Sequence, residues 1–327
     1  MPPVIILSIP SDASTTKVMR WMHYLDDSIN VIRLHPEDLY HGKITQTGID
    51  GNITIEVGKT KISTDDTGVA WLRKWGNPPL LQTMVGKNTR TTLDVLNAHI
   101  FDEYCVFFNF LVRKITLNKH TYWFNNPFYV SPNKLHQLEI AQKAGLKIPH
   151  TILRNQLTPE DLQKKMITKN LSEMATFSSS HNFYSTYTSQ VKNVNFKEHF
   201  FVSLFQEEIE KELELRVLYI DGICYAMAIF SQENSQTKTD YRRYDYENEN
   251  RMELFRLPQN INEAIVLFMN LMNLQTGSLD LILDKNGDYI FLEVNPSGQY
   301  DLFNNSNIQP DKLIAQHLIK KHYEYRH

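Results

Sequence analysis

A predicted β-hairpin near the carboxyl end constrains this 327-residue chain more than any other feature. Two short apolar runs, residues 277–284 and 291–298, are joined by the turn sequence Lys-Asn-Gly-Asp. Glu293 and Asn295 lie two residues apart on the second run, so both side chains point to the same side of a strand. Pairing the runs brings Asp280 of the first run beside them. Hard cations such as Mg²⁺ accept such an all-oxygen cluster together with nucleotide phosphates, and the sequence therefore predicts a metal-nucleotide site.

A simpler interpretation stays open at this point. Asp280 and Glu293 can also be solvated polar positions of an ordinary antiparallel pair, because short motifs match by chance. The context along the rest of the chain has to decide between the two.

The overall composition limits the class of protein. With 42% hydrophobic and 11% aromatic residues the chain can form globular cores, and its length suits roughly two domains. A formal net charge of −3 argues against nucleic acid or an anionic membrane as the main partner. Cys105 and Cys224 are far apart and predict neither a disulfide framework nor a zinc site. The apolar run at residues 4–9 is too short for a signal sequence or a membrane span, and we expect a cytoplasmic protein.

The first 125 residues are expected to form an α/β domain. An apolar strand at 4–9, a helical pattern at 18–25 and a second strand at 31–34 predict a parallel β-α-β unit. No Gly-rich phosphate loop follows these strands, so a Rossmann or P-loop nucleotide site is not expected here. The further expected elements are a polar hairpin at 53–62, a strand at 69–75 and a helix at 93–117.

A boundary near residue 125 separates this domain from the remainder, because Asn125-Asn-Pro127 interrupts the pattern. Ser131 as N-cap, a proline directly after it and Gly145 beyond the end predict a helix over 131–145. The other expected elements are strands at 148–153 and 166–168, a helix beginning at 158–161, strands and turns from 200 to 290, and a closing helix at 311–323.

Beyond residue 130, charged and polar residues follow one another in an order that is informative as a whole. The series consists of Lys134, Lys169, Gln206, Glu207, Glu208, Ile209, Glu214, Arg216, Asp240, Arg242, Asp280, Glu293 and Asn295. This series resembles that of the ATP-grasp ligases, in particular the branch of the graspetide synthetases and of the ligases that extend a ribosomal protein. In that family two α+β subdomains clamp ATP, a carboxylate is phosphorylated to an acyl phosphate, and a nucleophile displaces the phosphate.

The resemblance implies a nucleotide-binding role for the first part of the series. Lys134 and Lys169 would contact the ATP phosphates or the purine, and Glu214 would hold the ribose. Glu207 and Glu208 would form the hinge whose backbone meets the adenine edge, and the flanking Gln206 and Ile209 would also belong to the cofactor-binding residues.

For the remaining residues the resemblance implies roles in the chemistry. Arg216 and Arg242 would meet the γ-phosphate and the acyl-phosphate oxygens, where a planar fork stabilises spreading negative charge. Asp280, Glu293 and Asn295 would hold Mg²⁺ against the phosphates. The expected cofactors are therefore ATP and Mg²⁺.

Two positions depart from the family pattern. A Gly-rich flap commonly follows the second lysine, whereas residues 170–180 of this chain contain no glycine. The asparagine often found two positions after the Asp-x-Arg arginine is replaced by Tyr244. How the site closes over ATP is therefore left open.

Other segments indicate a peptide substrate. Residues 68–75, with Trp71 and Trp75, are similar to the Trp-x-Arg-Arg/Lys segment of graspetide synthetases, and residues 122–127 to their Trp-x-Asn-x-Pro segment. Residues 131–138 and 227–232 are similar to the grasp-with-spasm type. These enzymes join Asp or Glu side chains of a ribosomal precursor peptide, built of a leader and a core, to Ser, Thr or Lys side chains. The Asp240-x-Arg242 hairpin would face the acidic core residues, while simple burial is the alternative role for the tryptophans.

The sequence thus predicts a mixed α/β and α+β chain with the ATP-grasp fold. A pre-ATP-grasp domain for peptide recognition is expected at 1–125, a central lobe at 126–196 and a C-terminal lobe with the metal site at 197–327. The expected activity forms ω-ester or ω-amide macrocycles in a ribosomal precursor peptide, without a nucleic-acid or membrane partner. A ligase that adds amino acids to a protein tail and a non-catalytic peptide- or nucleotide-binding module remain alternatives, and a homodimer is left open.

Overall fold

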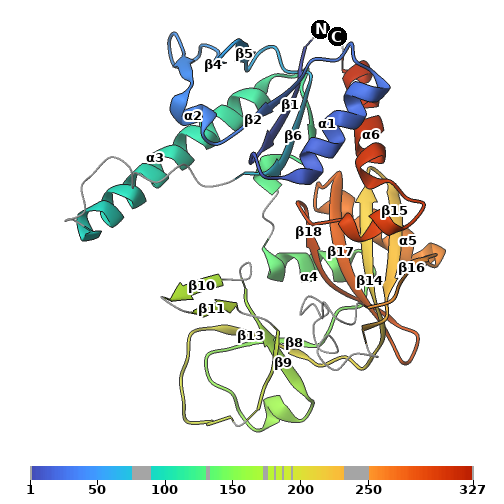
Figure 1. Cartoon of the computed structure of the whole chain (residues 1–327). Helices are drawn as coiled ribbons and strands as arrows, with labels where there is room; N and C mark the ends of the chain where they lie inside the picture. Colours follow the sequence, from blue (N-terminus) through green and yellow to red (C-terminus); the bar gives the residue numbers. More distant parts are fainter. Residues whose placement is uncertain are drawn as a thin grey trace. The chain divides into compact units, whose positions relative to one another are not determined.

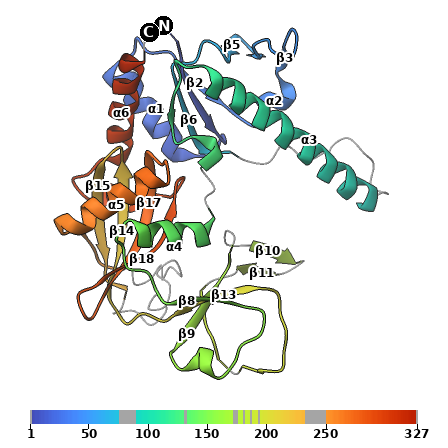
Figure 2. The same cartoon turned by 180° about the vertical axis from the view of Figure 1, so that it is seen from behind.

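The computed structural model (Figures 1 and 2) describes residues 2–75, 90–129, 133–171, 176–179, 182–185, 188–192, 194–231 and 250–325. It divides into two compact units, of which the first contains Met1–Val130 and Asp301–His327 and the second Ser131–Tyr300. The C-terminal helix, which the sequence division places with residues 197–327, lies in the first unit. Each unit is described by itself.

The first unit is built on a four-stranded parallel sheet. Its strands are ordered β2-β1-β6-β7 and span Val31–Leu34, Val4–Ser8, Val69–Lys74 and Tyr122–Phe124. β1 is buried along its whole length, as the continuous apolar run of an inner parallel strand requires. The predicted parallel β-α-β unit is confirmed.

Helices cover this sheet, and a small antiparallel sheet accompanies it. Helix α1 (Ala13–Leu25) packs against α6 (Pro310–Glu324), while α2 (Asp38–His41) precedes the small sheet. That sheet has the order β3-β4-β5, with strands Lys43–Thr45, Thr54–Val57 and Thr60–Ser63. The hairpin predicted at 53–62 is thus confirmed as β4 and β5.

Helix α3 (Arg90–Leu117) is the longest helix of the first unit. Among the described residues its stretch Val95–Leu117 alone is long and apolar enough to cross a membrane, with 11% of the tested window buried. The end of the helix nevertheless belongs to the core of the unit, because Leu111, Val112 and Ile115 pack there. A single stretch of this kind is weak evidence for a membrane span.

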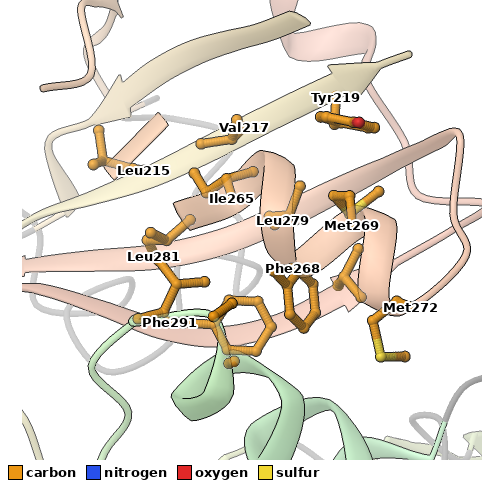
Figure 3. Packing of buried hydrophobic residues seen from close by; sticks show 14 of the residues in the cluster. Leu215, Val217, Tyr219, Ile265, Phe268, Met269, Met272, Leu279, Leu281 and Phe291 are labelled. Carbon is orange, nitrogen blue, oxygen red and sulfur yellow. The ribbon is translucent and has the colours of Figure 1, made fainter. Parts of the chain in front are cut away.

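The second unit contains a five-stranded antiparallel sheet. Its strand order is β16-β15-β14-β17-β18, with strands Met252–Phe255, Ile223–Ile229, Lys211–Ile220, Thr276–Asp284 and Tyr289–Asn295. One face carries the core of the unit, on which α5 (Gln259–Leu271) and α4 (Lys134–Lys143) pack. In Figure 3, Phe268 and Met269 of α5 lie against Leu279 of β17 and Phe291 of β18. The opposite face of this sheet is therefore available for polar side chains.

A smaller antiparallel sheet completes the second unit. It has the order β12-β9-β13-β8, with strands Ser189–Gln190, Met166–Lys169, Ser203–Glu207 and Thr151–Arg154. A separate hairpin consists of β10 (Thr176–Ser179) and β11 (Asn182–Ser185). A short 3-10 helix of this unit spans Glu160–Leu162, and two of the first unit span Pro127–Tyr129 and Asp301–Asn305.

Two helix predictions need correction. The helix expected from Thr158 is a 3-10 turn at Glu160–Leu162. Asp161 accepts the N–H and the hydroxyl of Thr158 as at a helix start, but β9 begins at Met166 and leaves no room for further turns. Helix α4 is capped by Asn133 rather than Ser131, since the Asn133 side chain accepts the N–H groups of the first turn. The end of α4 is as predicted, with Gly145 at φ +88° beyond it.

Candidate functional site

Several of the predicted site residues of the second unit lie on the polar face of the five-stranded sheet. Along β14, Leu215 and Val217 point into the core, so Glu214 and Arg216 point to the other face. The antiparallel register places Arg216 opposite Asp280 of β17 and Asp280 opposite Glu293 of β18. Three charged side chains thus lie in one row across neighbouring strands.

Arg216 is held firmly within this row. Its Nη1 donates to both carboxylate oxygens of Asp280, at 2.6 and 2.7 Å, and its Nη2 donates to the carbonyl of Gln299 at 3.2 Å. The residue is only 9% exposed, so the ion pair is protected from bulk water. A guanidinium fixed in this way is suited to stabilise a dianionic group without large rearrangement.

A β-bulge places Glu293 in the row. Leu281 pairs with Phe291, yet Asp280 pairs with Glu293, so Leu292 is the extra residue of β18. Without the bulge, strand alternation would put Leu292 opposite Asp280. The bulge therefore turns Glu293 toward the polar face while Phe291 stays in the core.

Helix α4 supplies a second cation to the row. The Nζ of Lys134 lies 3.4 Å from Oε2 of Glu293, with both side chains less than one-fifth exposed. One helical turn later, the buried side chain of Gln137 donates to the carbonyl of Val294 at 3.1 Å and accepts the Val294 N–H at 2.8 Å. This double hydrogen bond fixes the start of α4 on β18 and so positions Lys134.

Glu214 lies buried on the same face. Its Oε1 accepts from Lys211 Nζ at 2.9 Å and from the Ser231 hydroxyl at 2.8 Å. Burial nevertheless raises the pKa of Glu214 above its ordinary value, because desolvation outweighs the charge of Lys211. A buried carboxyl with a raised pKa beside a row of charges is typical of a functional site.

Sequence reasoning missed Lys211, Ser231 and Gln137. Lys211 and Glu214 are three residues apart, which puts side chains on opposite faces of a regular strand. A register shift between Lys211 and Leu213 brings them together, and nothing in the sequence announces it. The sequence did contain a sign that Gln137 has a role. It is a polar residue on the same helix as Lys134, which is predicted to contact ATP, and it lies next to the buried Leu138.

The donor set fits a hard cation shared with a nucleotide. Asp280 and Glu293 lie side by side in the sheet, and Asn295 follows on the same strand opposite Ser278. The amide oxygen of Asn295 accepts the Ser297 N–H at 3.0 Å, which holds the side chain in a turn at the end of β18. Among the described residues, no three His, Cys, Asp or Glu side chains form a metal cluster. Mg²⁺ is usually held by one or two carboxylates plus phosphates and waters, so this pair satisfies the requirement.

The predicted hinge begins at the end of β13, which contains Gln206 and Glu207, and continues through Glu208 and Ile209. The N–H of Glu207 donates to the His150 carbonyl at 3.0 Å and that of Glu208 to the Lys165 carbonyl at 2.8 Å. Both groups are used by the fold, which leaves the N–H of Ile209 as the candidate donor to an adenine edge. Gln206 is buried and donates to Thr151, while Lys164 lowers the pKa of Glu207 through a hydrogen bond.

The remaining predicted residues lie elsewhere. Lys169 ends β9 in the smaller sheet, opposite Leu204 of β13. Asp240 and Arg242, together with Tyr244, lie outside the described residues. Of the glycine-free segment 170–180, the structure describes residues 170–171 and the strand β10.

Two tryptophans of the substrate segments, Trp71 and Trp123, are core residues of the first unit, whereas Trp75 is half-buried and stacks on Phe108. Trp71 is 2% and Trp123 is 8% exposed, and the ring of Trp71 lies 5.8 Å from that of Phe124. Their burial accounts for these aromatics without any contact with a substrate.

Comparison with known proteins identifies the fold. No family model matches the chain, and no curated protein matches it either. Among solved structures, it is similar to a RiPP-associated ATP-grasp ligase of Chryseobacterium gregarium in complex with ADP and a leader and core peptide, with 25% identity, a TM-score of 0.80 and coverage of 98% of this chain and 97% of that one.

Two further structures have the same fold. The macrocyclase MdnC of Microcystis aeruginosa, bound with the precursor peptide MdnA, is 22% identical with a TM-score of 0.77 over 97% of this chain and 99% of that one. The ATP-grasp ligase PsnB, complexed with a variant of its minimal precursor, Mg and ADP, is 15% identical with a TM-score of 0.72 over 98% and 99%. The predicted ATP-grasp fold is thereby confirmed.

Proposed function

We propose that this chain, an ATP-grasp ligase, uses Mg²⁺ and ATP to activate Asp or Glu side chains of a ribosomal precursor peptide and joins them to Ser, Thr or Lys side chains. The products are ω-esters or ω-amides that close macrocycles within the peptide. The observation that carries the proposal is the row Arg216, Asp280, Glu293 and Lys134 on the polar face of the sheet. The likeness to ligases solved with ADP, Mg and precursor peptides supports the choice of cofactor and substrate.

In the row, two neighbouring carboxylates lie between two cations, and this order suits phosphoryl transfer. Asp280 and Glu293, with Asn295, would hold Mg²⁺, which supplies neutralisation of the phosphate charge. Arg216 and Lys134 are tethered to the same carboxylates, so they lie next to the position that the phosphates would take. Arg216 keeps its hydrogen bond to the Gln299 carbonyl, which orients the guanidinium fork.

The proposed reaction has two balanced steps. A peptide carboxylate oxygen forms a bond to the γ-phosphorus of ATP as the bond to ADP breaks, giving an acyl phosphate. A hydroxyl or amine of the same peptide then attacks the acyl carbon, loses a proton, and releases phosphate. The peptide has lost one water for each ring. Arg216 would stabilise the charge that spreads over the transferred phosphoryl group, and Asp240 and Arg242 would hold the acidic partner.

Glu214 and the hinge would bind the nucleoside. The Glu214 carboxyl accepts from Lys211 and Ser231 through one oxygen, and a carboxyl oxygen also suits a ribose hydroxyl as an acceptor. Ile209 would offer its N–H to the adenine edge. These roles predict that substitution of Glu214 affects the KM for ATP more than kcat.

The decisive experiment is mass spectrometry of a Thr/Glu-containing precursor peptide incubated with the enzyme, ATP and Mg²⁺. Loss of the mass of one water per ring is the expected result, and the Glu293→Gln variant serves as the inactive control. In a parallel reaction that also contains free amino acids, a gain equal to the mass of an amino-acid residue would instead establish a ligase that extends a protein tail. ATP consumption without either change would refute the peptide substrate.

Two further expectations stay predictions. The chain is proposed to act in the cytoplasm, and a homodimer is proposed as its assembly. Light scattering coupled to size-exclusion chromatography distinguishes a monomer from a dimer directly.

A further inference from the structure

The parallel sheet of the first unit ends in a strand edge that offers unpaired backbone groups. β2 is the outer strand next to β1, and the Val4 N–H donates to the Asn30 carbonyl at 2.9 Å. Because alternate residues of a strand face its neighbour, Ile32 also turns its backbone groups toward β1, while Val31 and Arg33 turn theirs outward. Among the described residues, no backbone hydrogen bond outside the β1 pairing involves Val31 or Arg33.

The small sheet presents a second free edge. β5 is its outer strand, and the Thr64 N–H donates to the Ile53 carbonyl at 3.0 Å. Counting back along the antiparallel ladder, Ile62 is also bonded to β4, whereas Lys61 faces outward. An outer strand with free N–H and C=O groups is a template for a further strand.

A cavity of about 490 Å³ lies along both edges. It is lined from β2 by residues 30–35 and from the β4–β5 hairpin by Val57 and residues 59–62. A neighbouring cavity of about 420 Å³ shares Asn30 and Val31 with it, so the hollow continues past the start of β2. The two volumes lie within the range of roughly 300–1,000 Å³ that is usual for ligand sites. Figure 1 labels these elements in the blue part of the chain.

The charge of the groove selects the kind of peptide. The charged residues that line the larger cavity are Arg33, Lys59, Lys61 and Asp38. The guanidinium of Arg33 donates to the carbonyls of Ile9 and Asp12, so Lys59 and Lys61 supply the positive charge of the groove. The Asp38 carboxylate already accepts the His35 N–H at 2.7 Å. The excess of positive charge favours a segment rich in Asp or Glu.

We propose that an extended acidic segment of the peptide substrate binds in this groove as an added strand on the β2 edge. Backbone groups of Val31 and Arg33 bond to the segment, and Lys59 and Lys61 meet its acidic side chains. The identity of the segment as part of the substrate rests on the proposed function. The strand-addition site itself rests on the two free edges, the cavity and its charge.

The first experiment measures binding without any reaction. The probe is a synthetic eight-residue peptide that alternates Glu with Val, compared with a twin that has Lys in place of Glu and with a version N-methylated at alternate residues. Amide exchange followed by NMR should slow at Val31 and Arg33 when the Glu peptide binds, and remain unchanged at Ile32. Equal binding of the N-methylated peptide, or no protection at these two amides, would overturn the added strand.

The second experiment uses a matched pair of variants. Lys61 and Lys43 are both exposed lysines that pair with Glu56, at 3.9 and 3.7 Å, but Lys43 lies on the opposite edge of the small sheet. Lys61→Glu should weaken binding of the Glu peptide about three- to tenfold and raise the KM for the precursor with kcat unchanged, while Lys43→Glu does neither. An equal effect of both variants would refute the groove.

The two proposals can fail separately. If the wild type forms rings and Lys61→Glu has an unchanged KM and unchanged binding, the groove is wrong and the proposed function stands. If no peptide is cyclised but the alternating protection pattern is seen, the groove is a peptide site and the proposed function falls.

Discussion

Two buried carboxylates with similar partners behave in opposite ways, and the contrast separates a structural cluster from a candidate site. Asp12 in the first unit is 5% exposed, and Glu214 in the second is 6% exposed. Each carboxyl accepts a hydrogen bond from a hydroxyl group and lies near a cation. Burial alone would raise the pKa of Asp12, but hydrogen bonds from Thr15 and the charges of Arg73 and Lys74 hold it below its ordinary value. Burial raises the pKa of Glu214 in spite of its partners.

The difference follows from what the fold asks of each residue. Asp12 caps α1 by accepting the Thr15 N–H, and the nearby Arg33 donates to the carbonyls of Ile9 and Asp12. The side chains of Asp12 and Arg33 are thus used in hydrogen bonds to backbone groups of the first unit. On the polar face of the second unit, Arg216 and Lys134 contact carboxylates that the fold does not need for capping. Charged side chains that no helix cap requires are candidates for binding a ligand.

The largest expected effect tests the cluster of Asp12, Arg73 and Lys74, which we interpret as structural. Asp12→Ala removes the cap of α1 and leaves Arg73 and Lys74 without their carboxylate, which should cost about 3–5 kcal/mol of stability. Thermal unfolding followed by circular dichroism measures it, and kcat for ATP turnover below the midpoint should stay unchanged. The control is Asp27→Ala, at an exposed position just after the same helix, which should change the midpoint little. Equal midpoints for both variants would assign Asp12 to something other than stability.

The next effect tests the site. Glu293→Gln should lower ATP turnover about 100-fold, or ~2.7 kcal/mol, because an uncharged amide holds Mg²⁺ poorly. Its thermal midpoint should remain close to that of the wild type, in contrast to Asp12→Ala. Glu139→Gln, an exposed change on α4, is the matched control and should be fully active. A Glu293→Gln variant with normal turnover and wild-type circular dichroism would remove the metal assignment.

The sequence was sufficient for the elements and for the central pairing of the site. The Asn-Gly turn predicted the β17–β18 hairpin, and the structure places Asp280 opposite Glu293. The apolar run at Val4–Ser8 predicted the inner parallel strand. Both follow from local patterns that burial imposes on a strand.

What the sequence could not provide are the irregularities. The bulge at Leu292 and the register shift before Leu213 depend on how neighbouring strands settle against α5 and α4, so no local pattern contains them. The helix predicted from Thr158 is only a 3-10 turn because the chain enters β9 at Met166, a pairing with distant strands that the local sequence does not contain. The roles assigned to the site residues stay predictions until the variants are measured.

A smaller effect distinguishes a positioned guanidinium from a simple charge. Arg216→Lys keeps the positive charge beside Asp280 but loses the fork that also reaches Gln299. We expect ADP affinity to be retained and kcat to fall about tenfold, or ~1.4 kcal/mol. Rapid-quench measurement of the first turnover separates chemistry from product release. If the lysine variant is as fast as the wild type, Arg216 supports the sheet and does not assist the reaction.

The smallest expected effect is the pH dependence of stability. It is the sharpest test of the comparison, because Glu214 and Asp12 should change stability with pH in opposite directions. The folded-state pKa of Glu214 lies above its ordinary value of 4.5, so the stability it contributes is present below that pH and is lost as pH rises through the folded pKa. The folded-state pKa of Asp12 lies below its ordinary value of 3.8, so its contribution is present above that pH and is lost as pH falls through the folded pKa.

Replacing each carboxyl by its amide removes the titration. The thermal midpoint of Glu214→Gln, relative to wild type, should therefore rise as pH increases from 4.5 toward neutrality. The thermal midpoint of Asp12→Asn, relative to wild type, should fall as pH increases through the acid range up to 3.8, and it should stay level above that pH. Scanning calorimetry of both variants over one pH series measures the two slopes. Slopes of the same sign would mean that the two carboxyls are held alike, and the raised pKa of Glu214 would no longer mark the polar face as a site.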